Sequence, residues 1–176
     1  MVQVVPIVRD LDTDQVRSSQ LGDEPVDEGG SSLVAYGEMY MVTPAATGSI
    51  TPGTPIKIAG TVAAGLTNLF SVTTTTGGRL TYTSATTRLF HVNGALTFTA
   101  GANTRTFGIY IAKNGTEETK TEIQRFTSTG TDYGAVALNG LFSLAQNDYL
   151  EVFVDITVGS ATTMTVQNLN LMAIEV

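Results

Sequence analysis

The sequence has no cysteine, no tryptophan and a single histidine among its 176 residues. Without cysteine the chain can have neither a disulfide framework nor a thiolate metal site. With His91 as its one imidazole, a zinc centre or a serine–histidine–aspartate triad would lack most of the side chains it needs. We therefore expect no catalytic residue, no metal ligand and no cofactor, and a protein that is not an enzyme.

Charged residues are also scarce. They make up 14% of the chain, against about 25% in an average soluble protein. The net charge of −7 is uneven, because residues 1–32 hold two arginines against seven acidic residues and so leave −2 for the other 144. An acidic chain repels phosphate backbones, which argues against nucleic-acid binding. The low charge fits a protein that covers much of its surface with a partner or with copies of itself.

Long apolar runs are missing as well. No segment approaches the roughly 18–20 apolar residues that span a membrane, so we expect no membrane segment. The apolar start MVQVVPIVRD lacks a basic leading region and a cleavage site. For that reason we do not predict a secretory signal.

Threonine, glycine and alternating apolar residues dominate what is present. Threonine is β-branched and suits a half-exposed strand, and no segment keeps a helical period over ten residues. The pattern predicts an all-β fold, an antiparallel β-sandwich or jelly roll with a short extended N-terminal arm. The predicted strands cover residues 34–43, 55–60, 67–73, 79–84, 87–93, 95–100, 106–113, 119–127, 133–144, 148–157 and 162–175.

Turn residues separate these predicted strands. Asn93-Gly94 and Asn114-Gly115 are the strongest signals, because Asn-Gly pairs favour the tight turns of two-residue hairpins. We therefore predict a hairpin at each pair. Weaker turn signals lie at residues 51–55, 76–78, 101–103 and 159–160.

Several predicted strands carry apolar residues on both faces. The sets are Phe107, Ile109 and Ile111 against Tyr110; Leu150, Val152 and Val154 against Tyr149, Phe153 and Ile156; and, close together near the end, Met164, Val166, Leu169, Leu171 and Ile174. A strand that is apolar on both faces is covered on both. We interpret the pattern as a sheet that packs against a neighbouring subunit.

The chain divides into two parts, an N-terminal arm with an acidic linker over residues 1–32 and a jelly-roll domain over residues 33–176. The segment VQVVPIV in the arm contains Pro6, which is compatible with an edge or added strand. Two interpretations remain open for the arm. It is a disordered tail, or it docks on a neighbour or a larger assembly, and a segment can be disordered when free and ordered when bound.

The remaining polar clusters indicate turns rather than chemistry. Glu117-Glu118 lies beside Lys113 and Lys120 and predicts a charged hairpin tip, not an acid/base pair. Asp148 is interpreted as a turn residue, with calcium binding as a weak alternative because few oxygen donors lie nearby. The acceptor pattern Asn114-Gly115-Thr116 is interpreted in the same way, as a turn.

The order of several motifs between about Gly37 and Val176 resembles a known family. The motifs are YGEMYM, GTPIKIAG, GGRLTYTSATTRLFHVNGALTFTA, FGIYIAKNG, LFSLAQNDYLEVFVDI and TTMTVQNLNLMAIEV. In this order they resemble the trimeric jelly-roll domains of bacteriophage structural proteins, which are similar in fold to the tumour necrosis factor and C1q heads. The resemblance covers about four-fifths of the chain and leaves out residues 1–32.

This resemblance implies a tight homotrimer that belongs to a virion, on the capsid exterior or on the tail. Cyclic symmetry with a large apolar contact is the expected form of such an assembly. The strands that are apolar on both faces would then pack at the three-fold axis. The trimer-interface residues that we predict are Tyr149, Phe153, Leu169 and Leu171.

Phage particles use such trimers as capsid decoration (cement) proteins or as the head domains of tail fibres. A fibre needs a shaft of heptads or repeats, which the sequence does not contain, whereas a short arm suits reaching across a surface. We therefore predict a decoration protein that bridges the major capsid protein or another virion protein and stabilises the shell. The predicted docking residues of the arm are Val2, Val4, Val5, Ile7 and Val8.

Two rival functions remain. A receptor-binding fibre head would recognise a host surface glycan or protein through tyrosines such as Tyr82, Tyr110 and Tyr133 on one outer surface. An enzyme such as a polysaccharide depolymerase would need a pair of carboxylates in a cleft, and the sequence offers no such pair.

Overall fold

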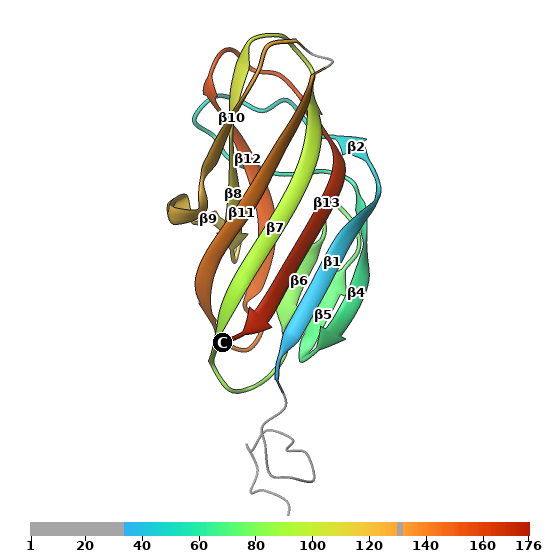
Figure 1. Ribbon diagram of the computed structural model, residues 1–176, viewed down its shortest axis with the longest axis vertical. Helices are drawn as coiled ribbons and strands as arrows, with labels where there is room; N and C mark the ends of the chain where they lie inside the picture. The colour runs from blue at the N-terminus through green and yellow to red at the C-terminus, as the bar shows by residue number, and fades with distance from the viewer. Residues whose placement is uncertain (1–33, 130–131) are drawn as a thin grey trace, which may run out of the picture.

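The computed structural model describes residues 34–129 and 132–176, which fold into two antiparallel sheets packed face to face (Figure 1). The elements are β1 (Tyr36–Thr43), β2 (Ala45–Ala46), β3 (Ile56–Lys57), β4 (Thr61–Asn68), β5 (Phe70–Thr73), β6 (Arg79–Tyr82), β7 (Arg88–Ala100), β8 (Arg105–Lys113), β9 (Thr116–Glu117), the 3₁₀ helix η1 (Thr119–Thr121), β10 (Ile123–Thr127), β11 (Tyr133–Leu144), β12 (Tyr149–Val158) and β13 (Met164–Glu175). The predicted arm, residues 1–32, lies outside the described residues.

The six-stranded sheet has the order β11-β7-β13-β1-β4, with β2 paired to β13. The seven-stranded sheet has the order β10-β8-β12-β6-β5, with β3 paired to β12 and β9 to β8. From β7 onward the chain passes repeatedly from one sheet to the other, as in a jelly roll. The predicted all-β antiparallel sandwich is confirmed. No helix within the described ranges is long and apolar enough to cross a membrane.

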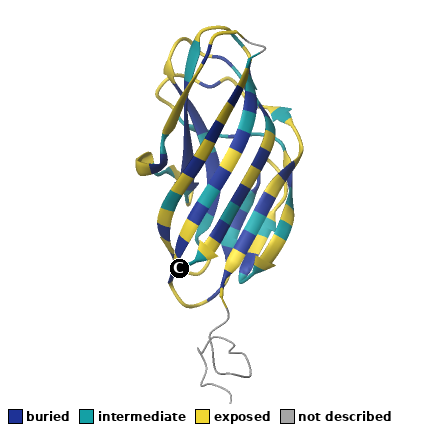
Figure 2. Ribbon diagram, in the orientation of Figure 1, coloured by how far each residue is buried: buried dark blue, intermediate teal, exposed yellow. Residues whose placement is uncertain are grey.

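Alternating side chains build the core between the sheets, and Figure 2 shows the resulting stripes of buried and exposed residues along β7, β11 and β13. Aromatic rings fill one end, where Phe90 lies 5.1 Å from Phe70 and 5.0 Å from Tyr82 between ring centroids. Edge-to-face pairs of this kind add to the free energy gained by burial. The Tyr82 hydroxyl donates to the Thr86 carbonyl at 2.8 Å, so its burial leaves no unpaired polar group.

The hairpin predicted at Asn93-Gly94 is wrong. Both residues lie inside the continuous strand β7, which pairs with β11 on one side and with β13 on the other. Gly94 is extended and sits against the core, where an added Cβ would lie 3.1 Å from Leu171 Cδ1. Two flanking ladders and this close packing outweigh the local preference for a turn. The predicted strands 87–93 and 95–100 are therefore a single strand.

The hairpin predicted at Asn114-Gly115 is confirmed. It joins β8 to β9, and both residues have positive φ, 54° and 79°. Positive φ at both central positions is what a type I′ turn requires.

Other predicted boundaries need correction. The predicted strand 119–127 divides into η1 and β10, because Thr121 turns inward and receives the Ile111 N–H on its hydroxyl at 2.9 Å. Of 55–60 only β3 is a strand. The strand β4 was largely missed, since its alternation is broken by a bulge opposite the segment from Gly37 to Met39.

Two faces were also assigned wrongly. Ile156 is 1% exposed and shares the core side of β12 with Val154 instead of lying beside Phe153. In β13 a bulge between Val166 and Asn168 reverses the alternation, so Ala173 enters the core and Ile174 points outward, 39% exposed. A bulge adds one residue and thereby exchanges the two faces of the strand beyond it.

Candidate interaction surface

The outer face of the six-stranded sheet is nearly free of charge. We call it the low-charge face and define it by the side chains of β11, β7, β13 and β1 that point away from the core. Cross-strand pairing arranges them in rows: Ala135, Thr97 and Asn168; Ala137, Ala95, Asn170 and Tyr40; Asn139, Asn93, Met172 and Glu38; Leu141, His91, Ile174 and Tyr36. The outward positions of these four fully described strands hold the Glu38 carboxylate and the His91 imidazole but no lysine, arginine or aspartate.

Large apolar side chains gather in one half of this face, near the C-terminus. Those in this half are Tyr36, Tyr40, Leu89, Leu141 and Ile174, each between 39% and 55% exposed, while Val42 and Tyr133 lie toward the other end, 55% and 67% exposed. The solvated face of an antiparallel sheet is normally polar. Extended apolar surface on a soluble domain marks a contact site, so this half of the face indicates a protein interface.

Small side chains leave a hollow beside that apolar half. The hollow has a volume of about 320 Å³ and lies between β11, β7 and β13. Its lining consists of Ala95, Leu96, Thr97, Ala135, Val136, Asn168 and Asn170. The bulge in β13 lies next to Asn168, one of these lining residues. The shape therefore suits a side chain inserted from another molecule.

The single carboxylate of the low-charge face is held in place by its neighbours. Asn170 Nδ2 donates to Glu38 Oε1 at 2.7 Å, which links β13 to β1. The carboxylate covers Gly65 of β4, where any Cβ would overlap it. The glycine thus makes room for Glu38 to lie flat, and the carboxylate does not disrupt the surface.

The outer face of the seven-stranded sheet is different, and we call it the charged face. Glu151 of β12 is 2% exposed and accepts Lys57 Nζ at 2.8 Å and Arg79 Nε at 3.2 Å. The Arg79 guanidinium also lies over the ring of Tyr149, 3.7 Å from its centroid. This network ties β3 and β6 to β12, and its charges compensate one another.

Tyr110 lies on the same charged face. Burial, together with the negative charges of Glu122 and Asp155, raises its pKa to about 12. The hydroxyl donates to Glu122 and stays protonated at neutral pH. Within residues 34–129 and 132–176, no group of three or more histidine, aspartate or glutamate side chains could hold a metal ion.

Asp148 joins two turns at the edge of the charged face. Its carboxylate accepts Lys113 Nζ at 2.8 Å, Asn114 Nδ2 at 2.7 Å and the Ala145 N–H at 2.9 Å. Burial alone would raise the pKa of Asp148, but these hydrogen bonds and the Lys113 charge outweigh it and hold the pKa below its usual value. The Asp148 N–H also donates to the Ala145 carbonyl at 3.0 Å and closes the turn between β11 and β12, which fits the predicted turn residue.

The four residues predicted for the trimer contact do not come together. Leu169 and Leu171 are 0% exposed and lie in the core between the sheets, so they have no surface with which to contact another chain, and that prediction is wrong for both. Tyr149 and Phe153 are half-buried on the charged face, on the opposite side of the sandwich. The alternation was recognised, but the core was mistaken for an interface.

The remaining predicted positions are scattered. Of the three tyrosines named for a receptor site, Tyr82 is 0% exposed, Tyr110 is 6% exposed and Tyr133 is 67% exposed on the other sheet, so they form no common groove. Glu118 pairs with Lys120 at 3.6 Å near the predicted hairpin tip. The arm residues Val2, Val4, Val5, Ile7 and Val8 lie outside the described residues.

Sequence reasoning missed the residues of the low-charge face. A usable signal was present, because every second residue from Leu89 to Thr99 and from Tyr133 to Ser143 is uncharged or histidine. These positions would normally carry the charges of a solvent-exposed strand face. Their composition, more than the apolar pattern of the core strands, indicates a contact surface.

No family model matches the sequence, and no curated protein matches it. Solved structures similar to the chain include Eiger TNF from S. frugiperda, with 9% identity over 81% of this chain and 92% of that one and a TM-score of 0.44. Murine APRIL has 14% identity over 74% and 98%, with a TM-score of 0.44. The globular domain of zebrafish complement 1qA has 7% identity over 82% and 97%, with a TM-score of 0.47. Similarity at this level carries nothing about assembly, partner or activity.

Proposed function

We propose that this chain is a non-enzymatic structural protein that assembles into a homotrimer through the low-charge face and decorates a phage capsid. The single observation that carries the assembly is the near absence of charge across the outward side chains of β11, β7, β13 and β1. That the copies number three, and that the assembly belongs to a virion, follow from the resemblance of the motif order to phage jelly-roll domains.

Burying this face costs little free energy. Desolvating an unpaired charge costs several kcal/mol. On this face only Glu38 and His91 have side chains that can carry a charge of the acidic or basic kind. Apolar area returns roughly 25 cal/mol per Å² on burial, and Tyr40, Leu141 and Ile174 supply such area. The hollow beside Ala95 gives the contact a shape that another copy can fill. We therefore assign the trimer interface to this face, in place of Leu169 and Leu171.

The decoration role rests on the arm. We propose that Val2, Val4, Val5, Ile7 and Val8 dock on a shell protein and that the acidic linker spans the gap to the domain. The described chain starts at Val34, at the same end of the sandwich as the C-terminus (Figure 1). Three arms held by different shell subunits would bridge those subunits and raise the free energy needed to separate them.

Sedimentation of the purified protein tests assembly, and binding to emptied, undecorated particles tests decoration. The full chain and a chain lacking residues 1–32 are compared in both measurements. We expect both chains to be trimers and only the full chain to bind the particles.

Other outcomes revise specific parts of the proposal. A stable monomer would contradict the trimer and the role of the low-charge face. A trimer that ignores particles but binds host cells or their glycans would replace decoration with receptor binding. Equal binding by both chains would move the docking site from the arm to the domain.

A further inference from the structure

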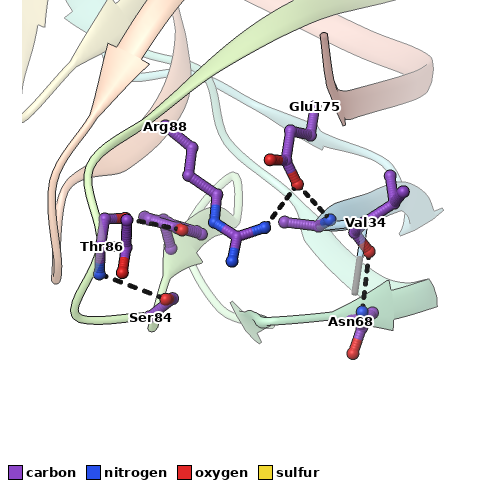
Figure 3. Close-up of polar contacts among 8 residues, drawn as sticks. Val34, Asn68, Ser84, Thr86, Arg88 and Glu175 are labelled. Atoms are coloured by element: carbon purple, nitrogen blue, oxygen red, sulfur yellow. Dashed lines mark hydrogen bonds and ion pairs between the residues drawn. The ribbon is translucent and has the colours of Figure 1, made fainter. Parts of the chain in front are cut away.

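The chain enters the domain at Val34 and Ala35, beside the C-terminus, and three strands hold it there (Figure 3). Ala35 and Glu175 exchange two bonds: the Glu175 N–H donates to the Ala35 carbonyl at 3.0 Å, and the Ala35 N–H donates to Glu175 Oε2 at 2.8 Å. On the other side, Asn68 Nδ2 of β4 donates to the Val34 carbonyl at 2.7 Å.

An ion pair with Arg88 also holds the Glu175 carboxylate in place. Arg88 Nη1 of β7 lies 2.7 Å from Glu175 Oε2, and Arg88 as a whole is 9% exposed (Figure 3). Hydrogen bonds that involve charged partners are about twice as strong as neutral ones. The first described residues are thereby tied to β4, β7 and β13 at once.

The contact with β13 continues far beyond this point. Residues 36–40 of β1 pair with residues 170–174, and β2 pairs with residues 165 and 166. After β2, Thr47 N–H donates to the Met164 carbonyl, and Ile50 forms a bridge with Thr162. From residue 35 to residue 50 the chain therefore follows β13 along its whole length, antiparallel to it.

The direction of a pull decides how this ladder responds. If the arm is pulled away while the far end of the sandwich is held, β1 and β13 must slide past each other and all their hydrogen bonds are loaded together. If the arm and the C-terminus are pulled apart, the pairs open one after another from Tyr36 and Ile174. Loading bonds together resists more force than opening them in sequence, because rupture then needs many bonds to fail at once.

We propose that residues 34–50 and β13, with Glu175, Arg88 and Asn68, form a tension clamp that keeps the domain folded when the arm is pulled by a partner. The clamp lies in the same sheet as the low-charge face, so tension from one arm passes directly into the contact between copies. The biological use of the clamp rests on the proposed function, in which the arm is the anchor. The mechanical property belongs to the fold alone.

Single-molecule pulling in defined directions tests the clamp, and the lack of native cysteine makes the attachment points specific. One variant carries Ser32→Cys and Ala161→Cys, with the second label at the far end of β13. Another carries Ser32→Cys and Val176→Cys. Each labelled variant is assembled with an excess of the unlabelled chain, so that each trimer contains at most one labelled chain. We expect an unfolding force at least about twofold higher in the first direction, since forced unfolding reports the unfolding rate along the pulled path. Equal forces would overturn the proposal.

Side-chain variants separate a clamp from general stability. Glu175→Gln and Asn68→Ala should each lower the force between labels at 32 and 161. Neither variant should change the unfolding force between labels introduced by Ser143→Cys and Ala161→Cys, because this pulling direction does not load the arm. Gln124→Ala removes an exposed hydrogen bond of 2.9 Å from Gln124 Nε2 to Glu122 Oε1, and as the matched control it should change the force in neither direction. Equal losses in both directions would indicate general destabilisation and refute the clamp. Failure to bind particles would refute the proposed decoration and leave this force ratio unaffected.

Discussion

The two outer faces of the sandwich have opposite chemistry. On the low-charge face, Glu38 is the one carboxylate among rows of alanine, asparagine, threonine and large apolar residues. On the charged face, Lys57, Arg79 and Glu151 form a compact ion network with Tyr149 packed against it. The charges of the charged face are paired within the chain, whereas the low-charge face carries almost no charge.

This difference shows where a partner fits at least cost. A surface whose charges already compensate one another gains little from a new contact. A surface without charges can be buried with little desolvation penalty and gains free energy from its apolar area. The comparison supports the proposal that copies of the chain associate through the six-stranded sheet, and changes that add or remove charge on each face test it.

The largest expected effect comes from placing a charge on the low-charge face. Ala95→Arg should dissociate the trimer, because an unpaired buried charge costs about 3–5 kcal/mol. Sedimentation velocity measures the change, and circular dichroism should show that the separated chain remains folded. Ser71→Arg, on an exposed position of β5 in the other sheet, is the control and should leave the trimer intact. Loss of assembly in both variants, or in neither, would remove the distinction between the faces.

A smaller effect is expected when the charged face loses its central carboxylate. Glu151→Gln should destabilise the fold by about 1–3 kcal/mol, since Lys57 and the partly exposed Arg79 then lose the charge of their shared hydrogen-bond acceptor. Urea unfolding measures the loss. Glu118→Gln breaks only the exposed pair with Lys120 and should cost less than about 0.5 kcal/mol. If the two variants were equally stable, the Glu151 network would not hold the charged face together.

Alkaline pH tests the hydrogen bond that the Tyr110 hydroxyl makes on the charged face. The pKa of Tyr110 is raised to about 12 in the folded chain, above the value of about 10 in the unfolded chain. The stability that it contributes is complete below about pH 10 and is lost as the pH rises toward about 12. Urea-unfolding midpoints should therefore fall over this interval.

Tyr110→Phe should flatten this part of the pH profile. At neutral pH the variant loses the hydrogen bond to Glu122, a cost of about 1 kcal/mol, and the gap to the natural chain should narrow at high pH. Tyr133→Phe changes a residue that is 67% exposed and serves as the control. A profile unchanged by Tyr110→Phe would show that Tyr110 does not titrate in this interval.

The smallest effects distinguish the two Asn-Gly pairs, one in each sheet. Gly115→Ala should cost about 1 kcal/mol, because its φ of 79° is unfavourable for any residue with a Cβ. Gly94→Ala should cost less than about 1 kcal/mol, since its backbone is extended and only the tip of Leu171 must shift. Thermal unfolding of the two variants makes the comparison. A larger loss at Gly94 would indicate that this glycine is the more critical of the two.

Local pattern predicted a large part of the fold. The alternation of Phe107, Ile109 and Ile111 located the core side of β8, and all three are 0% exposed. The prediction failed where pairing with a strand distant in sequence determines the local conformation. Asn93-Gly94 has the composition of a turn but lies between two ladders, and in β13 a bulge exchanges the two faces.

The candidate surface was predicted only in outline. The low overall charge indicated that the chain hides part of its surface, and this fits the low-charge face. The residues chosen for that role were the most apolar ones, Leu169 and Leu171, which the sandwich needs for its own core. The outward residues of the low-charge face are less apolar than the core residues, so the apolar pattern alone selects the core.

By itself, the sequence determined the class of structure. Threonine-rich alternation and turn residues dictate antiparallel strands, and the absence of cysteine excludes disulfides, because both depend on nearby residues or on composition. Only the tertiary structure decided which strands are neighbours, which alternating set faces inward, and that the uncharged positions of β1, β7, β11 and β13 lie on one surface. The physical reason is that a strand forms hydrogen bonds with a different neighbour on each of its two edges and packs each of its two faces against different surroundings. The identity of those partners depends on contacts between residues far apart in the chain.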